Sequence, residues 1–270
     1  MMRGMSWIAP RQTMLPRPLI SFSKLRRFKS ALKNQHNLQV IHGHFDMSLG
    51  KHLPSNAEFV TLLRDPVERA ISHYYHYRRL TTDSVHPLAM RSTLAEWVGT
   101  RGLVEMDNGQ TRRLAGEMGL PVGEVSSLTL AKAKASLANK FAVVGLAERF
   151  AESQILLHRQ FKWPYCRYPA RNVDHHRLWR TEVSSEVLKI VEHCNRFDRE
   201  LYRFATELFE HAADKIDMDR EISLLKIAPE YIASDRSEPD CSPPHSPGVL
   251  SKLKTLLSLG EGFTRIASLK

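Results

Sequence analysis

The segment Glu58–Arg79 constrains the fold of this chain more than any other part of the sequence. Its first residues, Glu58–Leu63 (EFVTLL), predict a short buried strand. Asp65 then offers an N-cap, Pro66 suits the first position of a helix, and Glu68 stands where a capping box has its acid. A strand that turns so directly into a helix favours an α/β fold.

The buried face of that helix is predicted from apolar residues at helical spacing, which are Val67, Ala70, Ile71, Tyr74 and Tyr75. Two more short buried strands are predicted at Gln39–His42 and Phe141–Gly145. Further helices are predicted at Thr93–Val98, Gly109–Ala115, Leu128–Ala138, Glu148–Phe161, Ser184–His193 and Arg196–His211.

The helical pattern fades after about Asp219. Ser237–Gly248 (SEPDCSPPHSPG) has the composition of a disordered linker, and Val249–Lys270 is compatible with a weakly amphipathic helix. We therefore expect three parts along the chain. They are an irregular basic segment over residues 1–22, a folded domain over 23–215, and a largely disordered tail over 216–270.

The formal net charge of +10 raises the question of a nucleic-acid partner. Residues 1–33 hold eight basic residues and no acid, so without those eight charges about +2 remains for the rest of the chain. No aromatic-interleaved basic motif accompanies the charge, and nucleic acid is therefore not the expected partner. The basic start is typical either of an organelle-targeting peptide or of an irregular segment.

No apolar run approaches the roughly 20 residues that a membrane-spanning helix needs, and we expect no secretory signal. The expected location is the cytoplasm, or the cytoplasmic face of the membrane, if the protein is bacterial. Organelle targeting through the basic N-terminus is the alternative. The cysteines, Cys166, Cys194 and Cys241, are too few and too scattered for a disulfide framework or a cysteine-based zinc site.

Arg64 follows the predicted strand Glu58–Leu63, at the end where open α/β sheets place their ligands. Its guanidinium donors and the positive end of the next helix suit a phosphate group. Ser72, two helical turns later, has a hydroxyl that can bind the same phosphate. The alternative is structural, with Arg64 paired to Asp65 or Glu68 and Ser72 on a solvated face.

His42 and His44 lie two residues apart on an extended segment, so their side chains point the same way. A neutral histidine is a suitable general base near pH 7. Two alternatives stay open at this point. One is a pair of structural histidines, which the bare pattern favours, and the other is a metal site with Asp46 as the third ligand.

A glycine-rich phosphate loop is expected beside such a site, and the nearest string is Gly43–Lys51 (GHFDMSLGK). Its glycines are too widely spaced, and His52 stands where Ser or Thr should follow the lysine. No G-x-G-x-x-G or G-x-S-x-G string occurs either. The residues alone therefore indicate half of a phosphate-binding site.

Four strings together resemble a known enzyme family. Val60–Arg79 (VTLLRDPVERAISHYYHYRR) resembles the 3′-phosphate-binding strand, turn and helix of sulfotransferases that use 3′-phosphoadenosine 5′-phosphosulfate (PAPS). Val40–Phe45 (VIHGHF) is similar to the Y-H-G-H element of the glycan branch, which contains heparan sulfate 2-O-sulfotransferase and its bacterial relatives. Asp107–Gly116 (DNGQTRRLAG) and Phe141–Phe150 (FAVVGLAERF) also resemble those relatives, and the resemblance covers about Ser23 to Ala212.

This resemblance implies a P-loop-like sulfotransferase fold, with a central parallel sheet flanked by helices. The implied reaction transfers a sulfuryl group from PAPS to a carbohydrate hydroxyl and leaves adenosine 3′,5′-bisphosphate. Arg64 and Ser72 correspond to the residues that bind the 3′-phosphate, and His44 to the catalytic base. Asn108 and Arg112 are weaker candidates that would help to close the site around a carbohydrate or polysaccharide acceptor. No metal is implied.

One part of the family pattern is not found. Family members begin with a strand and a P-K-T-G-type loop that binds the 5′-phosphosulfate and supplies a lysine. The sequence before Leu19 has no such string, so we expect an N-terminally truncated fold with apolar surface left uncovered beside Val60–Leu63. The alternative to an active enzyme is a degenerate, non-catalytic relative that keeps nucleotide or glycan binding.

Overall fold

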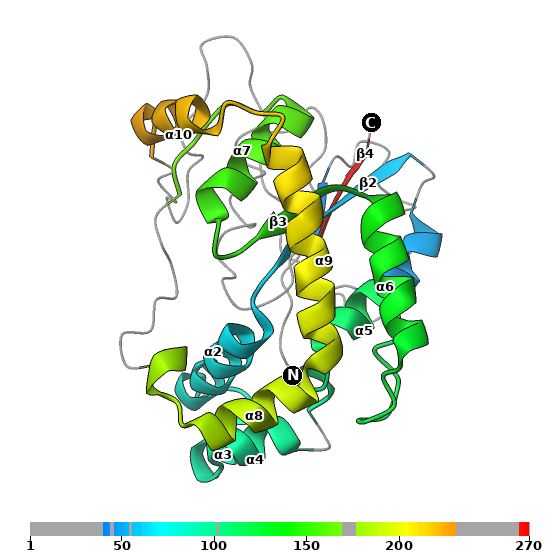
Figure 1. Ribbon diagram of the computed structural model, residues 1–270, viewed down its shortest axis with the longest axis vertical. Coiled ribbons are helices and arrows are strands. Elements are labelled where there is room, and N and C mark those ends of the chain that lie inside the picture. Colours follow the sequence, from blue (N-terminus) through cyan, green and yellow to red (C-terminus); the bar gives the residue numbers. More distant parts are fainter. Residues whose placement is uncertain are drawn as a thin grey trace.

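The computed structural model describes residues 40–43, 46–53, 56–100, 103–168, 177–230 and 265–269. These residues form an α/β structure with one small sheet and many helices (Figure 1). The basic segment 1–22 and the linker Ser237–Gly248 lie outside the described residues.

The predicted strand, turn and helix are confirmed. β2 (Ala57–Leu63) leads through Arg64 and Asp65 into α2 (Pro66–Arg79). The Asp65 side chain caps α2 by accepting hydrogen bonds from the backbone N–H groups of the second and third helical residues, each at 3.0 Å. The cap and the proline in the first turn explain why the helix begins where it does.

The second half of the expected capping box is replaced by tertiary contacts. The backbone N–H of Asp65 donates to Glu148 Oε1 at 3.0 Å, 83 positions away, rather than to Glu68. The Glu68 carboxylate pairs with Arg177 instead, at 3.0 Å and 109 positions away. These contacts fasten the start of α2 to two later parts of the chain.

The sheet has four strands in the order β1–β4–β2–β3. β2 and β3 (Phe141–Leu146) are parallel, with Leu63 opposite Leu146. β4 (Arg265–Leu269) lies between β1 (Val40–Gly43) and β2 and is antiparallel to both. The expected parallel arrangement is therefore confirmed for β2 and β3, whereas β4 makes the sheet mixed.

β4 bears on two expectations. The sequence predicts a weakly amphipathic helix over Val249–Lys270, of which the structure describes Arg265–Leu269, and these residues form a strand instead. The sequence also predicts a partly uncovered edge beside Val60–Leu63, and β4 pairs with this edge only as far as Thr61. The edges of β1 and β2 carry backbone groups that need partners, and a strand between them satisfies both, whatever the local propensity of its residues.

The predicted helices are confirmed within a few residues of their expected ends. α5 (Gly109–Ala115) has the predicted bounds, and α7 (Phe150–Phe161) begins after a turn rather than at Glu148. The others are α4 (Leu94–Gly99), α6 (Ser127–Lys140), α8 (Ser185–Cys194) and α9 (Arg196–Ala213).

Several elements are not predicted from the sequence. α10 (Met218–Ile227) falls within residues 216–270, where we expect a largely disordered tail, so helical structure continues further than the sequence pattern indicates. Its start is capped by Asp217, whose side chain accepts from the Arg220 N–H at 3.1 Å. The others are α3 (His86–Arg91) and the 3₁₀ helices η1 (Met47–His52), η2 (Val104–Met106) and η3 (Arg180–Glu182).

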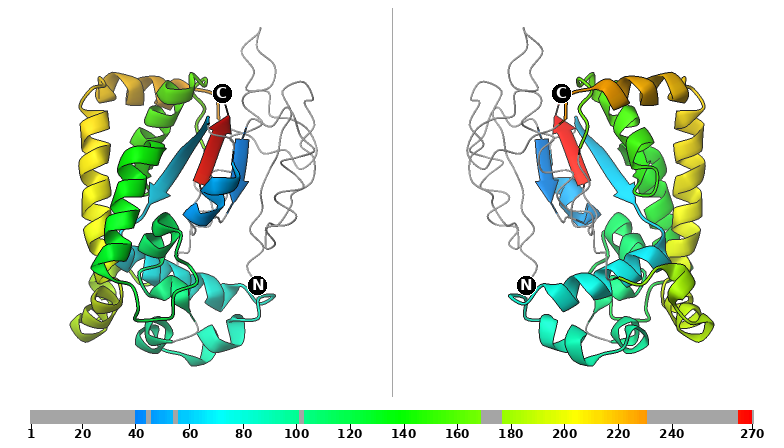
Figure 2. Two further views of the ribbon diagram at one scale, coloured as in Figure 1. Left: turned by 90° about the vertical axis from the view of Figure 1, so that its right-hand side faces the viewer. Right: turned by 90° about the vertical axis from the view of Figure 1, so that its left-hand side faces the viewer.

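Arg64 and Asp65 connect two hydrophobic clusters. The first cluster joins the sheet to α6, α7 and α9, which lie on one side of the sheet (Figure 2), and it includes Leu63 at the end of β2. The second cluster joins α2, α3, α4 and α8, and it includes Val67 at the start of α2. The turn that carries the candidate phosphate ligand is therefore anchored by apolar burial on both sides.

The predicted apolar face of α2 is confirmed in the second cluster, where it also buries His73. The His73 ring packs against Tyr77 and Trp97, with centroid separations of 4.8 and 5.8 Å. Neither of its nitrogens has a hydrogen-bond partner among the described residues. Burial, together with the positive charge of Arg69, lowers the pKa of His73 to about 3.

We expect the free energy of unfolding to fall as the pH is lowered from 6.5 to 4. The unfolded chain takes up a proton at His73 in this range and the folded protein does not, which removes at most about 3 kcal/mol. Urea titrations at pH 7 and pH 4 should show a smaller loss for His73→Phe than for wild type. The control is His211→Gln, at an exposed histidine, which should lose as much unfolding free energy between pH 7 and pH 4 as wild type does. A wild-type loss in His73→Phe would contradict the interpretation.

Candidate functional site

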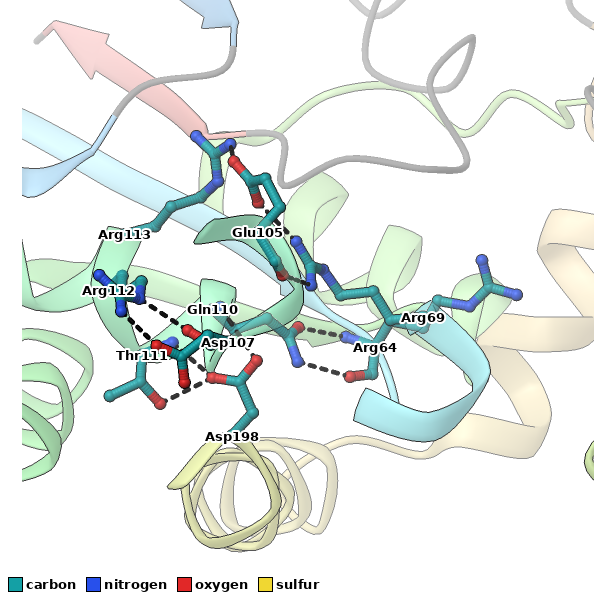
Figure 3. A network of polar contacts seen from close by, with 9 residues as sticks. All are labelled: Arg64, Arg69, Glu105, Asp107, Gln110, Thr111, Arg112, Arg113 and Asp198. Carbon is teal, nitrogen blue, oxygen red and sulfur yellow. Dashed lines mark hydrogen bonds and ion pairs between the residues drawn. The ribbon is translucent and has the colours of Figure 1, made fainter. Parts of the chain in front are cut away.

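Arg64 directly follows the last residue of β2, and a side chain from α5 holds its backbone. The Arg64 N–H donates to Gln110 Oε1 at 3.0 Å, and the Arg64 carbonyl accepts from Gln110 Nε2 at 2.9 Å. Figure 3 shows the Gln110 carboxamide facing the Arg64 backbone, while the Arg64 guanidinium group points away from the network. Gln110 thus holds the backbone of Arg64, and the Arg64 side chain leads away from this network.

The helices α5 and α9 cap each other. Asp198 of α9 accepts from the backbone N–H groups of Gln110 at 3.0 Å and Thr111 at 2.6 Å, and from the Thr111 hydroxyl at 2.7 Å. In return, Asn108 Oδ1 accepts from the N–H groups of Phe197 at 2.8 Å and Asp198 at 3.2 Å. Both capping side chains are fully buried, so the two helices form a fixed joint.

Two buried carboxyl groups in this region differ in their electrostatics. Burial raises the pKa of Asp198, although the charge of Arg69 and the hydrogen bonds from α5 act in the opposite direction. Burial would also raise the pKa of Glu105, but Arg113 and Arg69 outweigh it and bring the value down to about 2. Glu105 pairs with Arg69 at 2.7 Å and with Arg113, so one carboxylate anion is shared by two arginines.

Polar side chains from β3 and α9 meet at the turn after β2. Glu148, just beyond β3, accepts from the Asp65 N–H at 3.0 Å and from the Tyr202 hydroxyl at 2.8 Å. Burial, and then the hydrogen bond to Glu148, raises the pKa of Tyr202, which keeps its proton available for that bond. The carboxyl ends of both parallel strands and α9 are therefore joined at the candidate site.

The two weaker candidates, Asn108 and Arg112, are buried inside the network. Arg112 has no exposed surface, donates to the backbone oxygens of Asp107 at 2.6 Å and Pro121 at 2.8 Å, and pairs with the Asp107 carboxylate. Asn108 caps α9. Contact with an acceptor would require either side chain to leave these partners, so we assign both to the support of the fold.

Gly116 ends α5 against η1, the element that follows β1. Its φ is +75°, and a Cβ atom there would lie 2.8 Å from the backbone nitrogen of Ser48. Only glycine accommodates both the left-handed backbone and this close approach. The string Asp107–Gly116 thus contacts the turn after β2 through Gln110 and the chain after the H-G-H string through Gly116.

The other predicted site residues have different outcomes. Ser72 lies on α2 and is 5% exposed, so its hydroxyl belongs to the buried side of the helix. His42 lies on β1, which β4 separates from β2. His44 lies outside the described residues, so its role as the base stays a prediction.

Sequence reasoning does not identify Gln110, Glu148 or Asp198, although the first two stand within the strings that carry the family resemblance. The only available signal is the position of Glu148 immediately after a predicted strand. Nothing in the sequence indicates that Gln110 bonds a backbone 46 residues away.

A search of the described residues for metal sites finds no group of three or more His, Cys, Asp or Glu side chains placed to hold an ion. Among the same residues, no helix combines the length and the apolar character needed to cross a membrane.

Comparison with known proteins confirms the resemblance to glycan sulfotransferases, because the homologues found are heparan-sulfate sulfotransferases. Their names specify 6-O-sulfotransferases, whereas the motif comparison pointed to the 2-O branch. No family model and no solved structure matches the chain.

Three of these relatives define the extent of the match. Heparan-sulfate 6-O-sulfotransferase 1 of Homo sapiens is 30% identical over 185 residues, covering 58% of this chain and 44% of that protein. The Mus musculus protein of the same name is 29% identical over 189 residues, covering 60% and 45%. Heparan-sulfate 6-O-sulfotransferase 2 of Homo sapiens is 27% identical over 181 residues, covering 57% and 30%. The match thus spans less than half the length of each relative.

The contact between α5 and η1 can be tested with two glycines. Gly116 and Gly123 both have positive φ, of +75° and +89°, but a Cβ atom at Gly123 would meet nothing within 4 Å. Alanine at either position costs about 1–2 kcal/mol for the left-handed backbone. Gly116→Ala should cost about 1–3 kcal/mol more, because the Ser48 backbone must move. Denaturant unfolding measures the loss of unfolding free energy in each variant. Equal losses in Gly116→Ala and Gly123→Ala would argue against the contact.

Proposed function

We propose that this chain is a sulfotransferase that moves a sulfuryl group from PAPS to a carbohydrate hydroxyl, with a glycosaminoglycan-like polysaccharide as the acceptor. The observation that carries the proposal is the placement of Arg64. It stands at the carboxyl end of β2 and immediately before the capped N-terminus of α2, in a chain whose homologues are named heparan-sulfate sulfotransferases. A guanidinium group beside a helix N-terminus is suited to a phosphate.

The Arg64 side chain takes a different direction from those of the arginines that contact Glu105 (Figure 3). Arg69 and Arg113 share Glu105, and Arg177 is paired with Glu68. The Arg64 side chain points away from this network (Figure 3). We propose that Arg64, with Ser72 on the helix that follows it, holds the 3′-phosphate of the nucleotide.

PAPS, when bound, supplies the activated sulfuryl group. The chain's own contribution is to fix the nucleotide by its 3′-phosphate and to remove the acceptor proton, which we assign to His44. Positioning and charge stabilisation then account for most of the catalysis that these residues provide. Because the match covers part of each relative, the acceptor class is proposed from their names alone.

The alternative is a non-catalytic protein that binds the nucleotide or a glycan. The string Gly43–Lys51, which departs from a phosphate loop, favours it. One measurement distinguishes the two proposals. Both predict binding of adenosine 3′,5′-bisphosphate, and only the enzyme transfers sulfate from PAPS to heparan sulfate.

The nucleotide assignment predicts that Arg64→Ala weakens the binding of adenosine 3′,5′-bisphosphate at least tenfold. Losing a charge-assisted hydrogen bond costs about 1.5–3 kcal/mol. Isothermal titration calorimetry measures the dissociation constants. Arg79→Ala, an exposed arginine at the far end of α2, is the matched control and should stay within about twofold of wild type. Equal affinity in wild type and Arg64→Ala would remove the assignment.

The catalytic assignment predicts that His44→Ala abolishes sulfate transfer from labelled PAPS to heparan sulfate and leaves the affinity for adenosine 3′,5′-bisphosphate unchanged. A general base acts on the acceptor rather than on the nucleotide. His42→Ala is the matched control and should retain transfer. Full transfer by His44→Ala would move the base elsewhere, and binding without transfer by the wild-type chain would favour the non-catalytic alternative.

A further inference from the structure

Gln110 makes two hydrogen bonds to the backbone of Arg64, the residue that follows β2, in the way that a neighbouring strand would. The backbone groups of successive strand residues point to opposite edges. Because the Leu63 carbonyl accepts from the Ala147 N–H at 2.8 Å on the β3 side, the backbone groups of Arg64 point to the other edge. β4 pairs with β2 only over Ala57–Thr61, and Gln110 takes the place of a strand partner at Arg64.

Gln110 is itself held in a fixed position. Its side chain is fully buried, and its backbone N–H donates to Asp198 Oδ2 at 3.0 Å. Asp198 is fully buried too and is fixed by three hydrogen bonds from α5. A chain of short contacts therefore runs from α9 through Gln110 to the backbone of the residue that carries the proposed phosphate ligand.

We infer that Gln110 is a positioning residue for 3′-phosphate recognition, because it fixes the backbone from which the Arg64 side chain reaches the nucleotide. This inference rests on the proposed function. Gln110 does not itself contact the phosphate. Its carboxamide both donates and accepts, and both functions are used in pairing with the N–H and C=O of one residue. Removing them takes away the two hydrogen bonds that hold the backbone groups of Arg64, so the origin of the guanidinium group is less firmly fixed.

The test measures selectivity rather than stability. Calorimetry gives the affinities of the full chain for adenosine 3′,5′-bisphosphate and for adenosine 5′-monophosphate, which lacks the 3′-phosphate. The ratio of the two reports recognition of that phosphate. Gln110→Met keeps the approximate size of the side chain and removes both hydrogen bonds. Ser153→Ala is the matched control, because it removes two buried hydrogen bonds to the Leu146 backbone without touching Gln110, Asp198 or Arg64.

Wild type should prefer the bisphosphate at least tenfold, and Arg64→Ala should lose that preference. In Gln110→Met this preference should fall at least fivefold. The affinity of the variant for adenosine 5′-monophosphate should stay within twofold of wild type. Ser153→Ala should keep the wild-type ratio, and adding Gln110→Met to Arg64→Ala should reduce the ratio no further. Should Gln110→Met not fold, Gln110→Glu replaces it at pH 8, where an ionised carboxylate cannot donate to the Arg64 carbonyl.

Each other outcome has a distinct meaning. A wild-type ratio in the Gln110 variant overturns the positioning role and leaves the nucleotide assignment in place. An equal loss in Ser153→Ala also overturns it, because general loosening of the fold would then explain the effect. A wild-type protein without preference for the bisphosphate overturns the proposed nucleotide site, and the positioning role with it.

Discussion

The N-termini of α5 and α9 meet inside this protein, and a side chain from the start of each helix caps the other helix. Asn108 and Asp198 are 90 positions apart in the sequence, yet neither helix start has its N–H groups satisfied without the partner helix. Since an N-cap contributes about 1 kcal/mol and an unsatisfied buried group costs about 1–3 kcal/mol, the pair is strongly constrained. Once the joint is formed, Gln110 is placed beside Arg64 and the end of β2 is defined.

The turn after β2 is predictable from the sequence because its signals are local. An N-cap, a proline and an apolar period within Glu58–Arg79 are sufficient to place the strand, the helix and Arg64 between them. The contacts that fix this turn are not predictable, because Gln110 and Glu148 reach it from 46 and 83 positions away. The antiparallel β4 is not predicted from the sequence for the same reason, because its pairing depends on the edges of other strands.

The residue types of Asn108 and Arg112 do not by themselves distinguish a role in a binding site from a role in the fold. An arginine within a polar string is equally suited to an anionic substrate and to a buried carboxylate, and the sequence does not separate the two. The structure pairs Arg112 with Asp107 and leaves it without exposed surface. What the structure shows for Asp107–Gly116 is two hydrogen bonds from Gln110 to the Arg64 backbone and a close approach of Gly116 to Ser48.

The homology and the geometry lead to one region of the molecule. The class of chemistry is proposed from relatives named heparan-sulfate 6-O-sulfotransferases, and Arg64 is the proposed point at which a nucleotide would be held. The most direct measurement is a crystal structure of the chain with adenosine 3′,5′-bisphosphate. We predict that the 3′-phosphate oxygens lie about 2.7–2.9 Å from the Arg64 guanidinium nitrogens. A nucleotide bound with its 3′-phosphate away from Arg64 would contradict the proposed function.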